Sequence, residues 1–508
     1  MPARDLISPL VVPSEGGLVL DTGVYAMQPG WAQKLDNYEP DISGGYRRID
    51  GFSTWDSSAV AAGSTTSSRP VSGIQILDDK VIAARGTHLE VSTGSGWTSL
   101  SSTKTDGGKY VFDKYEWDGT EKIVGANGLD RAFTYDGSSF TTLSSTQLPS
   151  SPSTVIEHKG RLFFGEESDG NIAYTAPYVE NDGSPANGAG QIRVNDIFVG
   201  MRSFRENLII FCKNSIWRLE GSSPGDYVLK PITRRIGCVA PHSIQEIAGE
   251  LLFLGPDGLR TIAATDKIGD VALDNVSKPV QSLFKNVTTA NINSVVVKNK
   301  TQYRIFLVKD QDEADTKGVI AALRRKPVDQ GGQLGWEFSE IVGIKPNISH
   351  SDFIGDTETV LHGDIDGGFV YQQEDEDNSF DSAAIIAKYR TPDYVLGDAG
   401  LRKIVQRVMT NFEIEGICSF DIRVILNYDD QNTNQPTSKT ITATSGGSAY
   451  GNADYGVDTY GVVGIPFSRQ SLEGSGFAVA LEYSQNSASN PSYTIRGFDL
   501  ETIPGGRR

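Results

Sequence analysis

Residues 71–91 read VSGIQILDDKVIAARGTHLEV, and a second short run, GWTSL, follows at residues 96–100. Aliphatic and β-branched residues fill two runs on either side of the polar turn at Asp78 and Asp79, and Gly86 marks the next turn. Runs of about five to seven such residues, bounded by Gly, Asp or Ser, are typical of short antiparallel strands. This stretch therefore predicts one small antiparallel sheet whose strands are joined by tight turns.

The same pattern returns along the chain. Residues 110–135 carry a second unit, and the two unit endings, GWTSLSS at 96–102 and SFTTLSS at 139–145, align with each other. Further units open near Val155, Gly200, Ser243, Asn293 and Ser351. The first five openings lie about 40 to 45 residues apart, which is the period of a four-stranded propeller blade.

An all-β fold with a β-propeller of six or seven blades, covering residues 67–378, is what this repeat favours. One blade cannot bury both faces of its sheet, whereas blades packed around an axis share a core and leave few free strand edges. The units resemble one another only weakly, so one or two large β-sandwiches are the alternative. Convincing helical periodicity is confined to the short stretches 276–284 and 400–406.

Two regions flank the predicted propeller. Residues 379–508 lack the blade pattern and hold longer alternating strands, which predicts an appended C-terminal β-sandwich-like domain. The acidic run at 374–377 is interpreted as a solvated linker, and the Tyr-Gly pairs within 450–461 as a loop that either contacts a neighbour or has no partner. Residues 1–66 predict an extended N-terminal arm that caps the propeller or reaches a neighbouring subunit. We expect its deletion to weaken assembly more than propeller folding.

The charge and the cysteines exclude several classes of protein. A net charge of −18 argues against a grip on DNA phosphates and against docking on an anionic membrane. Cys212, Cys238 and Cys418 are far apart and show no C-x-x-C spacing, so neither a zinc site nor a disulfide framework is predicted. Neither a secretory leader nor an apolar run of about 18 residues is recognisable, and we expect assembly in a reducing cytosol.

The sequence singles out no catalytic, cofactor-binding or metal-binding residue, and we expect a protein that is not an enzyme. No H-E-x-x-H, G-x-S-x-G or Walker-type motif occurs. The acidic pairs at 310–312 and 364–366 lack the further ligands of an EF-type calcium loop and are interpreted as turns. The five histidines are spread over different units, and each is expected at a turn or on the surface: His88, His158, His242, His350 and His362.

Two weaker signals remain. Sialidase-like propellers carry repeated Ser-x-Asp-x-Gly-x-Thr-Trp boxes, but the nearest text, at residues 92–98, lacks the Asp and is not repeated. A glycoside hydrolase with paired carboxylates is therefore a distant alternative. The basic clusters at 234–235 and 324–326 lack interleaved aromatic residues, so ion pairing between subunits explains them at least as well as nucleic-acid binding.

Five stretches carry a resemblance to a known family. They read PGWAQKLDNY at 29–38, GGYRRIDGF at 44–52, RENLIIFCKNSIWRL at 205–219, IGCVAPHSI at 236–244 and YTIRGF at 493–498. In these stretches, and in LFLGPDGL at 252–259, the chain resembles the β-propeller tail proteins of tailed bacteriophages. That family includes the nozzle and head-to-tail stabilisation proteins of short-tailed phages, and the resemblance spans nearly the whole chain.

The resemblance implies a structural virion protein, assembled in the cytoplasm of the host bacterium, that forms a homo-oligomeric ring, usually a hexamer. Such a ring belongs to the tail nozzle or tube below the portal and adaptor proteins, where fibres are a further partner and no cofactor is needed. Genomic DNA would pass through the lumen during ejection without specific binding, which an acidic tube favours. The alternative is a β-propeller module that binds a protein or a glycan, because the fold alone does not decide function.

Overall fold

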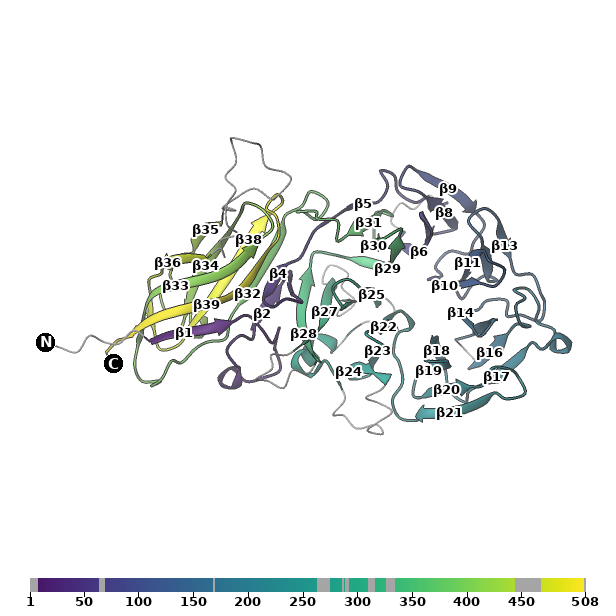
Figure 1. Cartoon of the computed structure of the whole chain (residues 1–508), viewed down its shortest axis with the longest axis horizontal. Coiled ribbons are helices and arrows are strands. Elements are labelled where there is room, and N and C mark those ends of the chain that lie inside the picture. The colour runs from purple at the N-terminus through teal and green to yellow at the C-terminus, as the bar shows by residue number, and fades with distance from the viewer. Residues whose placement is uncertain are drawn as a thin grey trace.

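The computed structural model is built almost entirely of β-strands (Figure 1). It describes residues 8–63, 69–167, 170–262, 275–285, 287, 292–308, 316–325, 334–443 and 467–506. Among these residues the helical elements are short 3₁₀ turns, of which η5, Lys278–Phe284, is the longest. Many glycines and short β-branched runs favour strands and turns over long helices, as the composition predicts.

Small antiparallel sheets stand around a common axis as the blades of a propeller (Figure 1). The first three blades are β6–β9 (Val71–Leu77, Lys80–Arg85, His88–Ser92, Trp97–Ser101), β10–β13 (Val111–Glu116, Glu121–Ala126, Phe133–Tyr135, Phe140–Thr142) and β14–β17 (Thr154–His158, Arg161–Gly165, Asn171–Tyr174, Gly190–Arg193). The next two are β18–β21 (Phe198–Phe204, Asn207–Cys212, Ile216–Glu220, Val228–Thr233) and β22–β24 (Gln245–Ile247, Glu250–Gly255, Gly258–Thr261).

The remaining blades close the circle. β25–β28 (Asn293–Val297, Gln302–Val308, Thr316–Arg325, Leu334–Val342) form four strands of a larger, nine-stranded sheet. β29–β31 (Pro346–Ile354, Thr357–Asp364, Val370–Gln373) form a separate sheet, to which β5 (Phe52–Thr54) adds the outermost strand. Tyr371 pairs with Thr54, so a strand from the start of the chain completes the last blade. The prediction of a propeller with six or seven blades is confirmed: in the described residues, six blades are sheets of their own and one belongs to the nine-stranded sheet.

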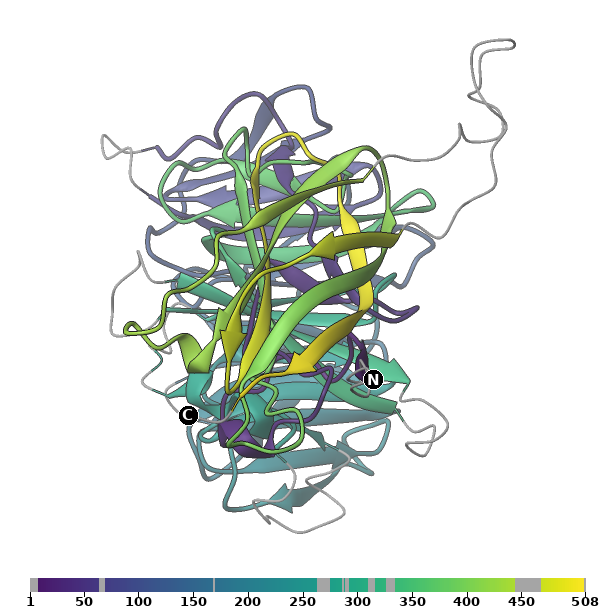
Figure 2. The ribbon, with the colours of Figure 1, turned by 90° about the vertical axis from the view of Figure 1, so that its left-hand side faces the viewer.

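Two sheets form the C-terminal domain at the left of Figure 1, seen from its own side in Figure 2. One contains β3 (Tyr38–Pro40), β4 (Tyr46–Arg48), β39 (Tyr493–Pro504), β33 (Lys403–Ile414) and β36 (Phe467–Ser471), with β1 (Ser8–Pro13) and β37 (Ser475–Gly476) at its sides. The other continues the nine-stranded sheet through β2 (Lys34–Asp36), β32 (Ile385–Arg390), β38 (Val479–Ser487), β34 (Cys418–Leu426) and β35 (Lys439–Ala443). Buried aliphatic residues and tyrosines fill the space between the sheets, which confirms a sandwich-like domain.

The N-terminal stretch, from Ser8 onward, is woven into both domains. β1 pairs with β39 along its whole length, and β2 lies between β28 of the propeller and β32 of the C-terminal domain. Because β2 bridges two otherwise separate sets of strands, the nine-stranded sheet runs across the predicted boundary at residues 378 and 379. The predicted arm therefore braces the two domains of its own chain and closes the last blade.

Residues 400–406 are not helical, contrary to the periodicity seen in the sequence. From Lys403 they belong to β33, a long strand paired with β39. Lys403 and Val405 are buried while Ile404 is exposed, an alternation with the period of a strand. The short run had matched a helical pattern by chance, and long-range pairing decided its structure.

Candidate functional site

The innermost strands of the blades surround an axial cavity of about 530 Å³. These strands are β6, β10, β14, β18, β22, β25 and β29, so every blade contributes to the wall. Blade backbones approach closely at the axis: a Cβ atom added to Gly73 would lie 2.6 Å from the Cβ of Tyr110. Both acidic and basic side chains line the cavity: Asp113, Lys114, Glu157, Arg202, Glu246, Lys298 and Asp352.

Asp352 is held as an ionised carboxylate at this axis. Its Oδ2 lies 2.7 Å from Nζ of Lys114, and its Oδ1 lies 3.4 Å from Nζ of Lys298. Burial alone would raise the pKa of Asp352, but the ion pair with Lys114 brings that pKa below its usual value. Because the three residues stand on or beside β29, β10 and β25, the pairs tie three blades together.

Asp113 is perturbed in the opposite direction. Its Oδ2 accepts the backbone N–H of Glu157 at 2.6 Å, yet burial raises the pKa of Asp113 to about 6. Glu157 turns its own carboxylate to the backbone N–H of Gly160, at 2.7 Å. The cavity therefore holds one carboxyl group that titrates near neutral pH and one that is fixed by lysines, a separation that acid–base sites also use.

The expectation that each histidine lies at a turn or on the surface is wrong for His158 and His362, which are buried in strands. His88 begins β8 and is half-buried. His242, in a 3₁₀ turn as expected, and His350, on β29, are half-buried and line the axial cavity. Burial lowers the pKa of His350 to about 4 and that of His242 well below its usual value, so both are neutral at pH 7. Sequence reasoning missed this pair because the two lie in different units. Each stands directly before a predicted unit opening, at Ser243 and Ser351, and this shared place was the signal that could have found them.

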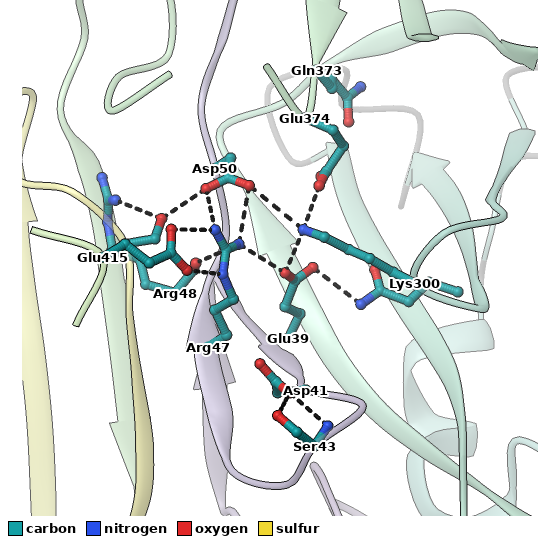
Figure 3. Close-up of polar contacts among 12 residues, drawn as sticks. Glu39, Asp41, Ser43, Arg47, Arg48, Asp50, Lys300, Gln373, Glu374 and Glu415 are labelled. Carbon is teal, nitrogen blue, oxygen red and sulfur yellow. Dashed lines mark hydrogen bonds and ion pairs between the residues drawn. The ribbon is translucent and has the colours of Figure 1, made fainter. Parts of the chain in front are cut away.

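A second polar cluster, which we call the junction network, lies where the propeller meets the C-terminal domain (Figure 3). Glu39, on β3, is its centre: its side chain is 2% exposed and accepts from Arg304 at 3.0 Å and from Lys300 at 2.7 Å. Arg304 also reaches Glu374 at 2.7 Å, and Lys300 pairs with the same carboxylate. Burial opposes the charge on Glu374, but Arg304 and Lys300 hold its pKa far below the usual value.

Arg47 extends the junction network to the C-terminal domain. Its guanidinium lies 3.1 Å from Glu39, 2.7 Å from Asp50 and 2.5 Å from Glu415, which follows β33. Burial disfavours the charge on Arg47, but these carboxylates raise its pKa above the usual value. Segments from the N-terminal stretch, two blades and the C-terminal domain thus meet in one set of ion pairs.

The acidic run at 374–377 is solvated only in part. Asp375 and Glu376 are exposed, as expected, but the side chain of Glu374 is enclosed in the junction network. The backbone carbonyl of Asp377 accepts the N–H of Gly51. An acidic run usually marks a solvated segment, because carboxylates are seldom buried without partners. The partners here, Arg304 and Lys300, lie about 70 residues away in the sequence, and a local pattern cannot reveal them.

The other residues singled out in the sequence are structural. Arg324 pairs with Glu337 at 2.6 Å within the chain, and the exposed Arg234 lies over the ring of Trp217. Asp364 accepts the backbone N–H groups of Asp366 and Gly367 and forms a turn, as expected. The three cysteines are buried free thiols. The acidic pair at 310–312 and the Tyr-Gly pairs within 450–461 lie outside the described residues.

The described residues contain no group of three or more His, Cys, Asp or Glu side chains arranged to hold a metal ion. Over the same residues no helix reaches the length and apolar character of a membrane span.

Comparison with known proteins yields similar folds and no family assignment. No family model and no curated protein matches the chain. An ancestral GH74 enzyme superposes with a TM-score of 0.39 at 12% identity over 72% of this chain, which spans 56% of that enzyme. The AfRom2 CNH domain superposes with a TM-score of 0.37 at 8% identity, over 63% of this chain and 98% of that domain. A glycoside hydrolase family 43 arabinoxylan arabinofuranohydrolase from Bacillus subtilis superposes with a TM-score of 0.26 at 9% identity. That match covers 90% of this chain and 99% of the hydrolase.

Proposed function

We propose that the chain is a structural subunit of a homo-oligomeric ring, the nozzle or tube component of a bacteriophage tail. The proposal rests on the resemblance of six stretches to the propeller-containing tail proteins of short-tailed phages. In this role the protein is not an enzyme: it is assembled in the host cytoplasm, takes its place in the virion below the portal and adaptor proteins, and receives fibres where the tail carries them.

The junction network and the shared nine-stranded sheet are compatible with this proposal, which the resemblance carries. A ring subunit in an ejection channel must transmit load between neighbours without separating into domains. β2 joins the strands of both domains, and Glu39, Arg47 and Glu415 link them by ion pairs in a mostly buried setting. A chain whose two domains are joined in this way is suited to be a structural subunit, because two domains joined only by a linker would move as separate bodies.

Charge supports the channel function in particular. Each copy carries a net charge of −18, so a ring of six is a strongly acidic body. DNA phosphates are repelled by acidic surfaces, and a polyanion would pass through such a lumen with little adhesion. A lumen lined mainly by Lys and Arg would contradict this part of the proposal.

Imaging of the purified chain tests the assembly. The chain is examined by negative-stain electron microscopy alone and after mixing with candidate portal and adaptor proteins. Closed rings, or tubes that form only with those partners, are expected. Single particles of propeller size under all these conditions would refute the ring proposal.

A binding module is the second candidate, and the axial cavity favours it. Its walls combine charged and hydrogen-bonding side chains from every blade, as ligand sites in concave pockets do. A glycan and peptide screen on the same samples separates the two candidates: specific capture by a chain that never assembles supports the module. The glycoside hydrolase alternative requires, in addition, turnover that depends on Asp113.

A further inference from the structure

Most charged groups of the axial cavity already have partners within the chain. Lys114 and Lys298 share Asp352, and the carboxylate of Glu157 accepts the N–H of Gly160. These groups have little capacity left for a ligand, since each satisfied charge would have to give up its partner first.

Three nitrogen-bearing side chains in the same cavity are different: Arg202 on β18, His242 in the 3₁₀ turn η3 (Pro241–Ser243), and His350 on β29. In the part of the chain that the structure describes, no hydrogen bond or ion pair holds any of these three side chains. Nε2 of His350 is fully buried and has no hydrogen-bond partner. Buried polar atoms without a partner are rare in folded proteins, and a water or a ligand from outside the chain would satisfy this nitrogen.

The three side chains share one electrostatic neighbourhood. The positive charge of Arg202 disfavours protonation of both His242 and His350, and it favours the ionised form of Asp113. Arg202, His242 and His350 all line the one cavity of about 530 Å³. A ligand that fills this cavity therefore lies against the walls that carry these three side chains.

An oxyanion fits this set of groups better than a neutral ligand does. A guanidinium presents N–H groups in a planar fork that matches two oxygens of a phosphate, and each neutral imidazole adds one N–H donor. The cavity, at about 530 Å³, falls within the range of small-molecule sites and has room for more than a bare phosphate. Ser203 and Glu246 line it and are exposed, so it opens to solvent.

We propose that the axial cavity binds a small phosphorylated molecule through Arg202, with His242 and His350 as further donors to the phosphate. This site is independent of ring assembly, and nothing in the structural role requires it. Tail proteins and propeller modules alike would gain from it a bound metabolite at the axis.

Binding should become tighter as the pH falls from 8 to 6. A bound phosphate favours the charged imidazolium, which burial disfavours in the empty cavity. Lys109 and Arg202 also lower the pKa of His242. The pKa of His350 is lowered by Lys114, Lys298 and Arg202 and raised by Asp352. Protonation of Asp113, whose pKa burial raises to about 6, removes a nearby negative charge over the same range. Glu157 and Glu246 are the remaining acids of the wall.

Calorimetric titration of the full-length chain tests the site. The probes are AMP, inorganic phosphate and adenosine, each at pH 6 and pH 8. AMP is expected to bind, more tightly at pH 6, and adenosine is not. Comparable binding of inorganic phosphate assigns the site to free phosphate, whereas binding of AMP about tenfold tighter assigns it to an organic phosphate; both results support an oxyanion site.

Two variants and one control complete the experiment. Arg202→Gln should weaken AMP binding about tenfold or more, because it removes the charged fork. His350→Gln should weaken it less and flatten the pH dependence, which keeps the test decisive if one variant unfolds. Arg235→Gln, at an exposed arginine outside the cavity, should bind like the unaltered chain. Absence of binding by AMP and by phosphate, equal binding of adenosine, or unchanged affinity in Arg202→Gln would overturn the proposal.

Discussion

Replacing Glu39 by Gln should destabilise the chain strongly, although the two side chains have nearly the same shape. Glu39 accepts from Arg304, Lys300 and Arg47, and the side chains of Glu39 and Arg304 are both only 2% exposed. An amide offers one acceptor oxygen and no charge, so Arg304 would keep its charge in a buried site with one carboxylate, Glu374, in place of two. Losing one partner of a buried ion pair costs about 3–5 kcal/mol. Since Glu374 remains, we expect a loss of about 3 kcal/mol in the free energy of unfolding.

Urea unfolding followed by tryptophan fluorescence and circular dichroism measures this loss. Glu116→Gln is the matched control, because Glu116 is exposed on β10 and its loss should change stability by about 0.5 kcal/mol or less. A Glu39→Met, Arg304→Met double variant should recover part of the loss, since removing both charges leaves neither one unpaired. A Glu39→Gln chain as stable as the control would refute the claim that the junction network holds the domains together.

The remaining predictions concern pH and chain closure. The pKa of Glu374 is depressed in the folded chain, so its contribution to stability is present above the usual value of 4.5 and is lost as the pH falls below it; urea unfolding at pH 3 to 7 should show a weaker acid dependence in Glu374→Gln. The pKa of Asp113 is raised to about 6, so its ionisation destabilises the fold as the pH rises from about 4 through 6. The stability of Asp113→Asn minus that of the unaltered chain should therefore be larger at pH 8 than at pH 4. Deletion of residues 1–54 should lower the thermal midpoint of the propeller itself and expose it to protease, because β5 closes the last blade; a truncated chain with an unchanged midpoint would contradict this account.

This deletion result would differ from the expectation based on sequence alone. The sequence alone predicts that residues 1–66, which show no core of their own, matter for assembly more than for folding. A short strand such as β5 carries almost no local signal, since its role depends on a partner, β31, that lies more than 300 residues away. The brace at β2 was hidden in the same way.

Blades, in contrast, could be predicted because their signal is local. Strands β6 and β7 are joined by the turn at Asp78 and Asp79, and each is rich in aliphatic or β-branched residues. Such hairpins are specified by neighbouring residues, and their repetition at a fixed period indicates a propeller. Contacts that join blades or domains depend on residues far apart in sequence.

The axial cavity lies between these two cases. Its residues sit at equivalent places in successive units, so a repeat alignment could have drawn attention to Arg202 and His350. Such an alignment could not have predicted which of these side chains have partners. Lys114 pairs with Asp352 of another blade whereas Arg202 has no such partner among the described residues, and this difference arises only where the blades meet at the axis. The raised pKa of Asp113 could not be predicted from the sequence either, since burial in the folded chain is its main cause.

The mass of the chain in solution tests the central claim most directly. Light scattering on the purified protein, over a wide range of concentrations and again with portal and adaptor proteins added, gives that mass without labels. A ring subunit should reach about six times the chain mass of 54.9 kDa, alone or with those partners. A mass that stays at that of one chain in every mixture would contradict the ring and leave a propeller that works alone.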